Sequence, residues 1–308
     1  MAVCACDGLT LSNTGVPSCQ PLQSVVKRLI IVPLRDSSNN KNGIDLTSIP
    51  TNAGIEALIN AADAKARYYP LPLMESVTNE RADTITEEAP SGTLAKIRNG
   101  AKSFFGEIWF QGSTFAGLVD SFGCGQVGAF IVDGDDNLIG DRSVAGFLYP
   151  LAIKMPTWDV RTLDTTDTTV AKVTIGFQWK DAISDSDVGM LLASDFDSST
   201  SWLDYNGLIS LNGTLETPVP SATSFTMKVT TDFGSVKNPT VAGGLAQNDF
   251  EIDDNGTPLS IAQFAEAPTG VYKFEYVGAA PATYSLRIKS TTLGYDDTKL
   301  RAVVITTQ

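Results

Sequence analysis

Histidine is absent from all 308 residues of this chain. Its imidazole is the only side chain whose unperturbed charge changes near neutral pH, and it is the commonest metal ligand in proteins. Most hydrolytic and metal-dependent sites are therefore difficult to build from this sequence. The absence predicts a structural or binding protein and not an enzyme, and we expect no catalytic residue and no cofactor.

The charge of the chain is strongly negative, because 35 acidic residues face 22 basic ones and leave a net charge of −13. A general nucleic-acid-binding surface is disfavoured, since such surfaces neutralise phosphates with clustered Lys and Arg. The same charge suits a surface along which DNA slides without binding. No run of about 20 apolar residues occurs, so no membrane span is expected. The N-terminus has no signal-peptide pattern, which predicts that the protein stays in the cytoplasm where it is made.

The cysteines give little support for a metal site. Cys4, Cys6 and Cys19 lie close together, and Cys124 stands alone. Zinc sites use four ligands with two to four residues between paired cysteines, and this spacing departs from that rule. We expect reduced thiols, or a bond that ties down the N-terminal segment. Cys124 lies between two glycines, which predicts a turn with a small buried thiol.

Two acidic motifs could carry chemistry, and each has a simpler explanation. Residues 133–144 place oxygen side chains as a calcium loop does, but Leu138 and Val144 occupy the positions that need glycine and glutamate. An Asp/Asn-rich hairpin turn explains the segment better. Glu87 and Glu88 are adjacent, so on a strand they face opposite ways and cannot act as a catalytic pair.

The pattern of apolar residues predicts a mainly β fold with one or two helices. The clearest helix begins after a cap at Thr51 or Asn52 and runs to residue 62, and a shorter one covers residues 113–122. A further helix is expected from 185 or 186 to 192. Strands are expected at 24–34, 96–110, 146–154 and 169–179, with a hairpin over 129–140. Glycines within 96–110 indicate a bulge or a close backbone approach.

Near residue 217 the pattern changes, because Pro218 and Pro220 mark a linker. Short strands follow at 225–230, 250–252, 270–277, 283–289 and 300–306, a spacing typical of an immunoglobulin-type sandwich. We expect 270–274 and 284–288 to pair. The predicted division is an N-terminal arm over 1–23, a main β-rich domain over 24–216 and an immunoglobulin-like domain over 217–308.

The order of elements resembles that of virion structural proteins from tailed bacteriophages, and among these it is most similar to tail tube proteins. The resemblance is carried by the segment from Asn79 to Gly92 leading into 97–102, and by the hairpin 130–140. It implies a β-sandwich or barrel core that closes into hexameric rings, with a continuous inner barrel and a C-terminal decoration domain. The rings stack through a long loop or arm to conduct DNA.

The resemblance also implies partners and a location. The partners would be copies of the chain itself, other virion proteins, and DNA that passes without specific binding; the location would be the virion tail, after synthesis in the bacterial cytoplasm. Segment 76–95 is long and polar for a connection between strands, which makes it a candidate inter-ring contact. The N-terminal arm could also clamp a neighbour. The candidate inter-subunit residues are Asn79, Glu80, Arg81, Asp83, Glu87, Glu88 and Arg98.

Two other classes of protein fit the same sequence. A capsid-associated protein, meaning a major capsid, decoration or head-fibre subunit, would also be β-rich and lack catalytic residues. A carbohydrate-binding or adhesion protein would use tryptophans as stacking platforms, although tryptophans in a β-rich core are more often packing elements. The tryptophans in question are Trp109, Trp158, Trp179 and Trp202.

Overall fold

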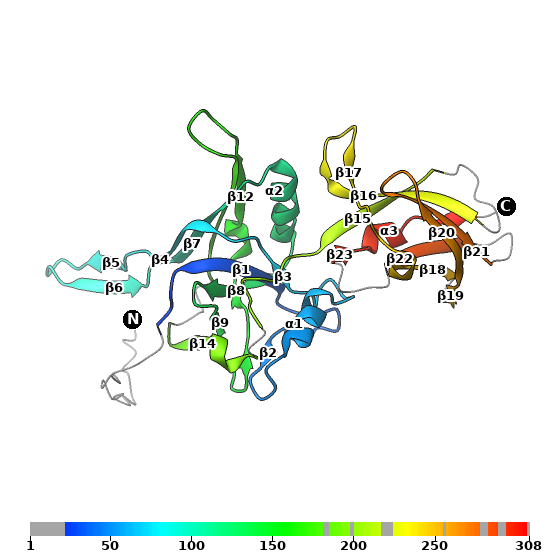
Figure 1. Cartoon of the computed structure of the whole chain (residues 1–308). Coiled ribbons are helices and arrows are strands. Elements are labelled where there is room, and N and C mark those ends of the chain that lie inside the picture. The colour runs from blue at the N-terminus through cyan, green and yellow to red at the C-terminus, as the bar shows by residue number, and fades with distance from the viewer. Residues whose placement is uncertain are drawn as a thin grey trace.

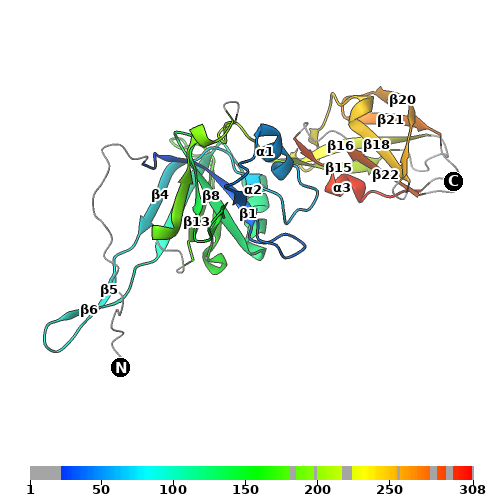
Figure 2. The ribbon, with the colours of Figure 1, turned by 90° about the horizontal axis from the view of Figure 1, so that it is seen from below.

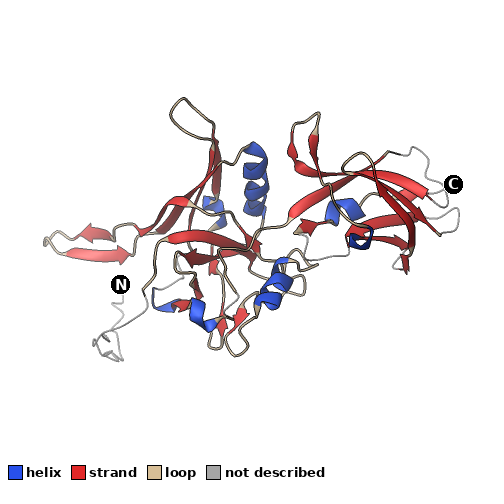
Figure 3. Ribbon diagram, viewed as in Figure 1, coloured by secondary structure: helices blue, strands red, loops and turns tan. Residues whose placement is uncertain are grey.

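Strands dominate the protein, as Figure 3 shows. The computed structural model describes residues 22–180, 185–197, 200–216, 224–254, 257–277, 283–288 and 294–306. Within these ranges there are three short helices: α1 (Asn52–Ile59), α2 (Ser113–Asp120) and α3 (Thr298–Arg301). The predicted mainly β fold is confirmed. Cys4, Cys6 and Cys19, like most of the expected N-terminal arm, lie outside the described residues.

The first sheet, sheet 1, holds the most buried strands of the chain. Its strand order is β14-β9-β8-β1-β3, and β11 also pairs with β8. Leu29 to Val32 in β1 have no exposed surface, because both faces of the sheet are covered. The bounds are β1 (Val26–Pro33), β3 (Tyr69–Pro70), β8 (Val127–Asp133), β9 (Leu138–Asp141), β11 (Leu151–Ala152) and β14 (Val188–Leu191).

Sheet 2 covers one face of sheet 1 and has the order β12-β13-β7-β4. Alternate side chains of its strands point to the core, where Phe104 stacks on Phe177 with ring centroids 5.0 Å apart. These rings join Leu29 and Ile131 of sheet 1 in one apolar cluster. The bounds are β4 (Glu75–Arg81), β7 (Lys102–Trp109), β12 (Asp159–Leu163) and β13 (Lys172–Gln178).

Helix α1 covers the other face of sheet 1. Thr51 caps it by accepting a hydrogen bond at Oγ1 from the Gly54 N–H, as the sequence predicts. Ile55 and Ile59, four residues apart, are buried in a second apolar cluster with Trp202. The helix ends at Ile59, three residues earlier than expected, because Asn60 leaves the helical conformation and its side chain donates to the Glu56 carbonyl. Beside it, β2 (Ile44–Asp45) pairs with β10 (Phe147–Leu148).

Two predictions need correction in the part of the chain that forms sheets 1 and 2, which we call the main β region. The expected strand over 96–110 is two strands, β6 (Leu94–Arg98) and β7, separated at Gly100. A Cβ on Gly100 would lie 1.9 Å from the Ala82 carbonyl oxygen, so the predicted close backbone approach is correct. The helix expected over 185–192 is wrong. A single 3-10 turn, Asp185–Asp187, leads into β14, whose pairing with β9 on the edge of sheet 1 outweighs the local helical pattern.

The C-terminal region consists of two further sheets around a separate apolar cluster (Figure 1). Sheet 3 is β20 (Ile261–Glu266), β21 (Val271–Tyr276), β16 (Ser224–Gly234), β15 (Ile209–Leu215) and β23 (Tyr295–Asp296), with β17 (Pro239–Val241) paired to β16. Sheet 4 is β19 (Thr257–Leu259), β18 (Phe250–Asp254), β22 (Thr283–Ile288) and β24 (Ile305–Thr306).

Two C-terminal predictions are wrong in detail. β21 and β22 do not pair with each other, because β21 pairs with β16 and β20 while β22 pairs with β18 and β24. The strand expected over 300–306 is the end of α3 followed by the short β24. The immunoglobulin-type topology and the boundary at residue 217 stay predictions. The linker residues 217–223 lie outside the described ranges, and β15, which precedes them, already pairs with β16.

Candidate assembly interface

One hairpin of the chain projects away from the rest of the molecule. β5 (Ile85–Glu88) and β6 (Leu94–Arg98) extend from the end of sheet 2, on the side opposite the C-terminal sheets (Figures 1 and 2). Every residue of both strands is exposed. We call residues 82–99 the exposed hairpin. The sequence predicted a long polar segment over 76–95 and a strand from residue 96 onward, but no hairpin. A two-stranded ribbon without a covered face is marginally stable by itself in water, so this hairpin lacks the packing that stabilises the other strands.

Charge is distributed unevenly along the exposed hairpin. At its distal end Glu87 faces Ala95 and Glu88 faces Leu94 across the ribbon, so neither glutamate meets a cation. Lys96 and Arg98 lie nearer the base. Adjacent residues of a strand point to opposite faces, so each face of the distal end presents one glutamate.

The seven predicted contact residues divide into two groups. Glu80, Asp83, Glu87, Glu88 and Arg98 are exposed, and within the described part of the chain they form no ion pair. The other two, Asn79 and Arg81, form contacts at the base of the exposed hairpin.

Asn79 accepts a hydrogen bond of 3.0 Å at Oδ1 from Trp179 Nε1, and it faces the core. Arg81 donates to the Gly100 carbonyl at 3.2 Å and pairs with Asp185 at 3.0 Å. These two side chains therefore support the base of the exposed hairpin.

Sheet 2 has two open edges. Among the described residues, β4 pairs only with β7, and β12 pairs only with β13. All three strand pairs are antiparallel, so the two edge strands run in opposite directions. An open edge presents unpaired N–H and C=O groups to any strand that approaches it.

Two cations on the open face of sheet 2, the face that points away from sheet 1, are paired with carboxylates. Lys172 lies 2.7 Å from Glu107, and Arg161 lies 2.7 Å from Asp159. Burial tends to raise the pKa of Glu107, but hydrogen bonds from Lys172 and Trp109 outweigh it and hold that pKa below its usual value. Glu80 of β4, opposite Ser103, is exposed on the same face, so this face has no excess positive charge.

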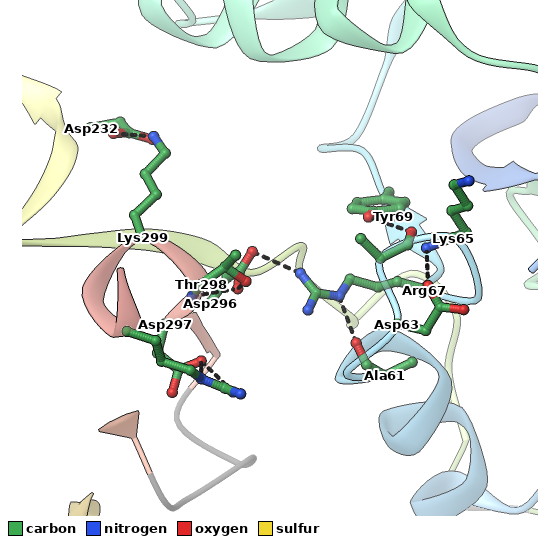
Figure 4. A network of polar contacts seen from close by, with 12 residues as sticks. Ala61, Asp63, Lys65, Arg67, Tyr69, Asp232, Asp296, Asp297, Thr298 and Lys299 are labelled. Atoms are coloured by element: carbon green, nitrogen blue, oxygen red, sulfur yellow. Dashed lines mark hydrogen bonds and ion pairs between the residues drawn. The ribbon is translucent and has the colours of Figure 1, made fainter. Parts of the chain in front are cut away.

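Arg67 and Asp296 form an ion pair between the main β region and the C-terminal sheets (Figure 4). Arg67 Nη1 lies 2.7 Å from Asp296 Oδ2, and Arg67 Nε donates to the Ala61 carbonyl at 2.9 Å. The Arg67 side chain is 8% exposed. Burial opposes ionisation of Asp296, but hydrogen bonds from Thr298 and Arg67 outweigh it and lower its pKa. No sequence pattern predicts this contact, because 229 residues separate the partners.

The acidic turn 133–137 is a hairpin turn, as predicted. Asp133 is fully buried and accepts four hydrogen bonds: from the N–H groups of Ser24, Asp135 and Asn137 and from Asn137 Nδ2, at 2.9–3.0 Å. Its oxygens therefore satisfy the local backbone. In the part of the chain that the structure describes, no three histidine, cysteine or acidic side chains are grouped as metal ligands.

The tryptophans and Cys124 complete the set of predicted residues. Trp202 and Trp179 are buried, and Trp158 stacks on Phe177 at 5.5 Å, so these three are packing elements. Trp109 is 43% exposed on the open face of sheet 2. Cys124 ends a 3-10 turn, Ser121–Cys124, but it is exposed and not buried as expected, because its turn lies on the surface.

Comparison with known proteins adds no relative. No model of a protein family matches the chain, and no curated protein matches its sequence. None of the described helices has the length and apolar character needed to cross a membrane. The features that bear on function are therefore the two open edges of sheet 2 and the exposed hairpin.

Proposed function

We propose that this chain is a non-enzymatic structural protein that assembles with copies of itself, and that its place is the tail tube of a bacteriophage virion. The observation that carries the proposal is sheet 2, an antiparallel sheet of four strands with both edges open. The exposed hairpin, which extends from the same sheet, supports it. The resemblance of the sequence to tail tube proteins supplies the biological setting.

Ring formation follows from the strand directions in sheet 2. An even number of antiparallel strands leaves edge strands that run in opposite directions, so β4 of one copy can pair antiparallel with β12 of the next. Because the two edges differ, the contact is head to tail, and a head-to-tail contact produces either a closed ring or an open helical filament. We propose closure, with six copies as in the proteins that the sequence resembles.

Stacking of rings would use the exposed hairpin. Its strands are exposed on both faces, and it projects beyond the body that bears it. Leu94 and Ile97 are 66% and 58% exposed, and contact with another copy would remove their apolar surface from water. The hairpin thus gains its missing packing when rings meet. Other virion proteins would meet the ends of the stack.

DNA would pass through such a tube without specific binding. The chain carries a net charge of −13, so phosphates are repelled at long range. On the open face of sheet 2 the cations Arg161 and Lys172 are already paired with carboxylates, which leaves few partners for phosphate. We place this face toward the conduit.

Negative-stain electron microscopy and native mass spectrometry of the concentrated protein test the proposal. We expect rings with a central hole, stacks of these rings, and masses at multiples of 32.7 kDa. A matched variant replaces residues 83–100 with Asn-Gly, a two-residue turn that the Ala82–Ala101 backbone pair can accommodate. It should form rings without stacks.

Three other results would each change the assignment. A monomer at every concentration would contradict self-assembly. Closed shells or isolated trimers would assign the protein to the capsid or to a head fibre instead of the tail. Binding of a glycan through Trp109, the exposed tryptophan, would favour an adhesion protein.

A further inference from the structure

Four cations gather around two adjoining concavities on the main β region. The concavities have volumes of about 510 and about 270 Å³ and share Leu34, Arg35 and Gln126 in their linings. We call the joined surface the basic trough. Its cations are Arg35, Lys41, Lys65 and Lys180, and the acidic residues that line it are Asp36 and Asp141.

Backbone pairing positions three of the four trough cations. Arg35 and Lys41 face each other across an antiparallel bridge. The Lys180 N–H donates to the Ala152 carbonyl at 2.9 Å, which brings Lys180 to the same concavity. Lys41 Nζ lies 5.3 Å from the ring centroid of Tyr149. Segments far apart in the sequence therefore present positive charge at one place.

Three of the trough cations, Arg35, Lys41 and Lys180, have no carboxylate partner in the described ranges, whereas Lys65 lies beside Asp63 and interacts electrostatically with it. Lys27, Arg81, Lys102, Arg161 and Lys172 all lie within 4.0 Å of a carboxylate oxygen. Like charges that share a concavity repel one another, so an anion that enters it is favoured.

The distal end of the exposed hairpin is such an anion. Glu87 and Glu88 face no cation across the ribbon and form no ion pair within the described part of their own chain. A flat surface would meet only one of them, because they point to opposite faces. A concavity can contact both faces at once, and this matches the shape of the basic trough.

We propose that the basic trough binds the distal end of the exposed hairpin from a second copy of this chain, with Glu87 and Glu88 near Lys41 and Lys180. This inference rests on the proposed function and names the surface that receives the hairpin. The contact is electrostatic and solvent-accessible, so salt weakens it: the screening length falls from about 8 Å at 0.15 M to about 3 Å at 1 M salt.

Charge reversal on each side, followed by their combination, tests the proposal. The hairpin variant is Glu87→Lys with Glu88→Lys, and the trough variant is Lys41→Glu with Lys180→Glu. Each should raise the protein concentration at which stacks appear by about tenfold or more, while rings persist, because repulsion replaces attraction. The fourfold variant should stack at a concentration close to that of the wild type, since the charges are exchanged.

Matched controls reverse charges elsewhere on the surface. The control variants are Asp167→Lys and Lys237→Glu. Asp167 lies on the exposed connection between β12 and β13, and Lys237 lies on an exposed turn of the C-terminal region. Neither should change stacking, because neither residue belongs to the hairpin or the trough. A change equal to that of the test variants would show that net charge alone controls stacking, and would overturn the proposal.

Zero-length carbodiimide coupling of the assembled wild type gives a direct second measurement. It joins carboxylates to amines in contact, and mass spectrometry should find Glu87 or Glu88 linked to Lys41 or Lys180. Links from these glutamates only to lysines outside the trough would overturn the proposal. So would wild-type stacking in both charge-reversed variants, or failure of the fourfold variant to recover; these results would leave ring formation standing. A wild type that stays monomeric would overturn the proposed function as well.

Discussion

The two clearest hairpins of the main β region differ in almost every physical respect. The β8–β9 hairpin is buried along nearly its whole length, and its turn is held by the four hydrogen bonds to Asp133. The β5–β6 hairpin is exposed along its whole length and carries its glutamates at the distal end. The first contributes to the stability of the fold. The second contributes little to it, and its surface suits an intermolecular contact.

The largest expected effect lies in the buried hairpin. Phe130 in β8 has no exposed surface and stacks against Tyr68 with ring centroids 5.8 Å apart. Phe130→Ala leaves a cavity and should lower the free energy of unfolding by about 3–5 kcal/mol. Denaturant unfolding followed by tryptophan fluorescence measures it. A loss below about 1 kcal/mol would show that this hairpin does not stabilise the fold as we describe.

The next effect concerns the turn of the same hairpin. Asp133→Ala leaves buried N–H groups without an acceptor and should cost about 3 kcal/mol. Burial opposes the ionisation of Asp133, but hydrogen bonds from Ser24, Asn137 and Asp135 outweigh it and lower its pKa.

The lowered pKa of Asp133 sets a pH dependence. Its stabilising effect is present above the unfolded-state pKa, about 4, and is lost as the pH falls through the lower folded-state pKa. Unfolding measured from pH 7 to pH 3 should therefore show a decline in the wild type below about pH 4 that is smaller in Asp133→Ala. Equal declines would contradict this role for Asp133.

A smaller effect is expected at the contact between the main β region and the C-terminal sheets. The Arg67–Asp296 pair is neither fully exposed nor fully buried, so Arg67→Gln should cost about 2 kcal/mol. Small-angle scattering should show a wider range of orientations between the two regions. Lys237→Glu, on an exposed turn, is the matched control and should leave both measurements unchanged.

The smallest effect on stability is expected in the exposed hairpin. Leu94→Ser with Ile97→Ser removes apolar groups that are more than half exposed, so the free energy of unfolding should change by less than about 0.5 kcal/mol. The same variant should stack poorly, as sedimentation velocity can measure. A large loss of stability with normal stacking would mean that this hairpin packs within its own chain.

The two hairpins also show how far the sequence can predict the structure. An apolar run, an Asp/Asn turn and a second apolar run predict the buried β8–β9 hairpin, and the structure confirms it. The exposed one has no such pattern, because no buried face imposes an alternation on residues 85–98. The sequence showed that this segment is long and polar and predicted a strand from residue 96, but it did not indicate a hairpin.

Other features could not be predicted from the sequence because they depend on tertiary packing. A helix was expected over 185–192, but the structure has a turn at Asp185 followed by strand β14, because β14 pairs with the edge of β9. The Arg67–Asp296 pair and the basic trough join residues far apart in the chain, and periodicity carries no information about such pairs. Of the predicted contact residues, Asn79 and Arg81 form side-chain hydrogen bonds or ion pairs with other described residues of the chain.

Amide hydrogen exchange at increasing protein concentration can show whether the exposed hairpin becomes packed only when copies of the chain assemble. Amides of residues 85–98 should exchange fast in the dilute protein and become protected as copies assemble, while amides of β8 and β9 should be protected at every concentration. Protection of residues 85–98 that is the same in the dilute monomer and the concentrated protein would contradict this expectation, and so would fast exchange at all concentrations.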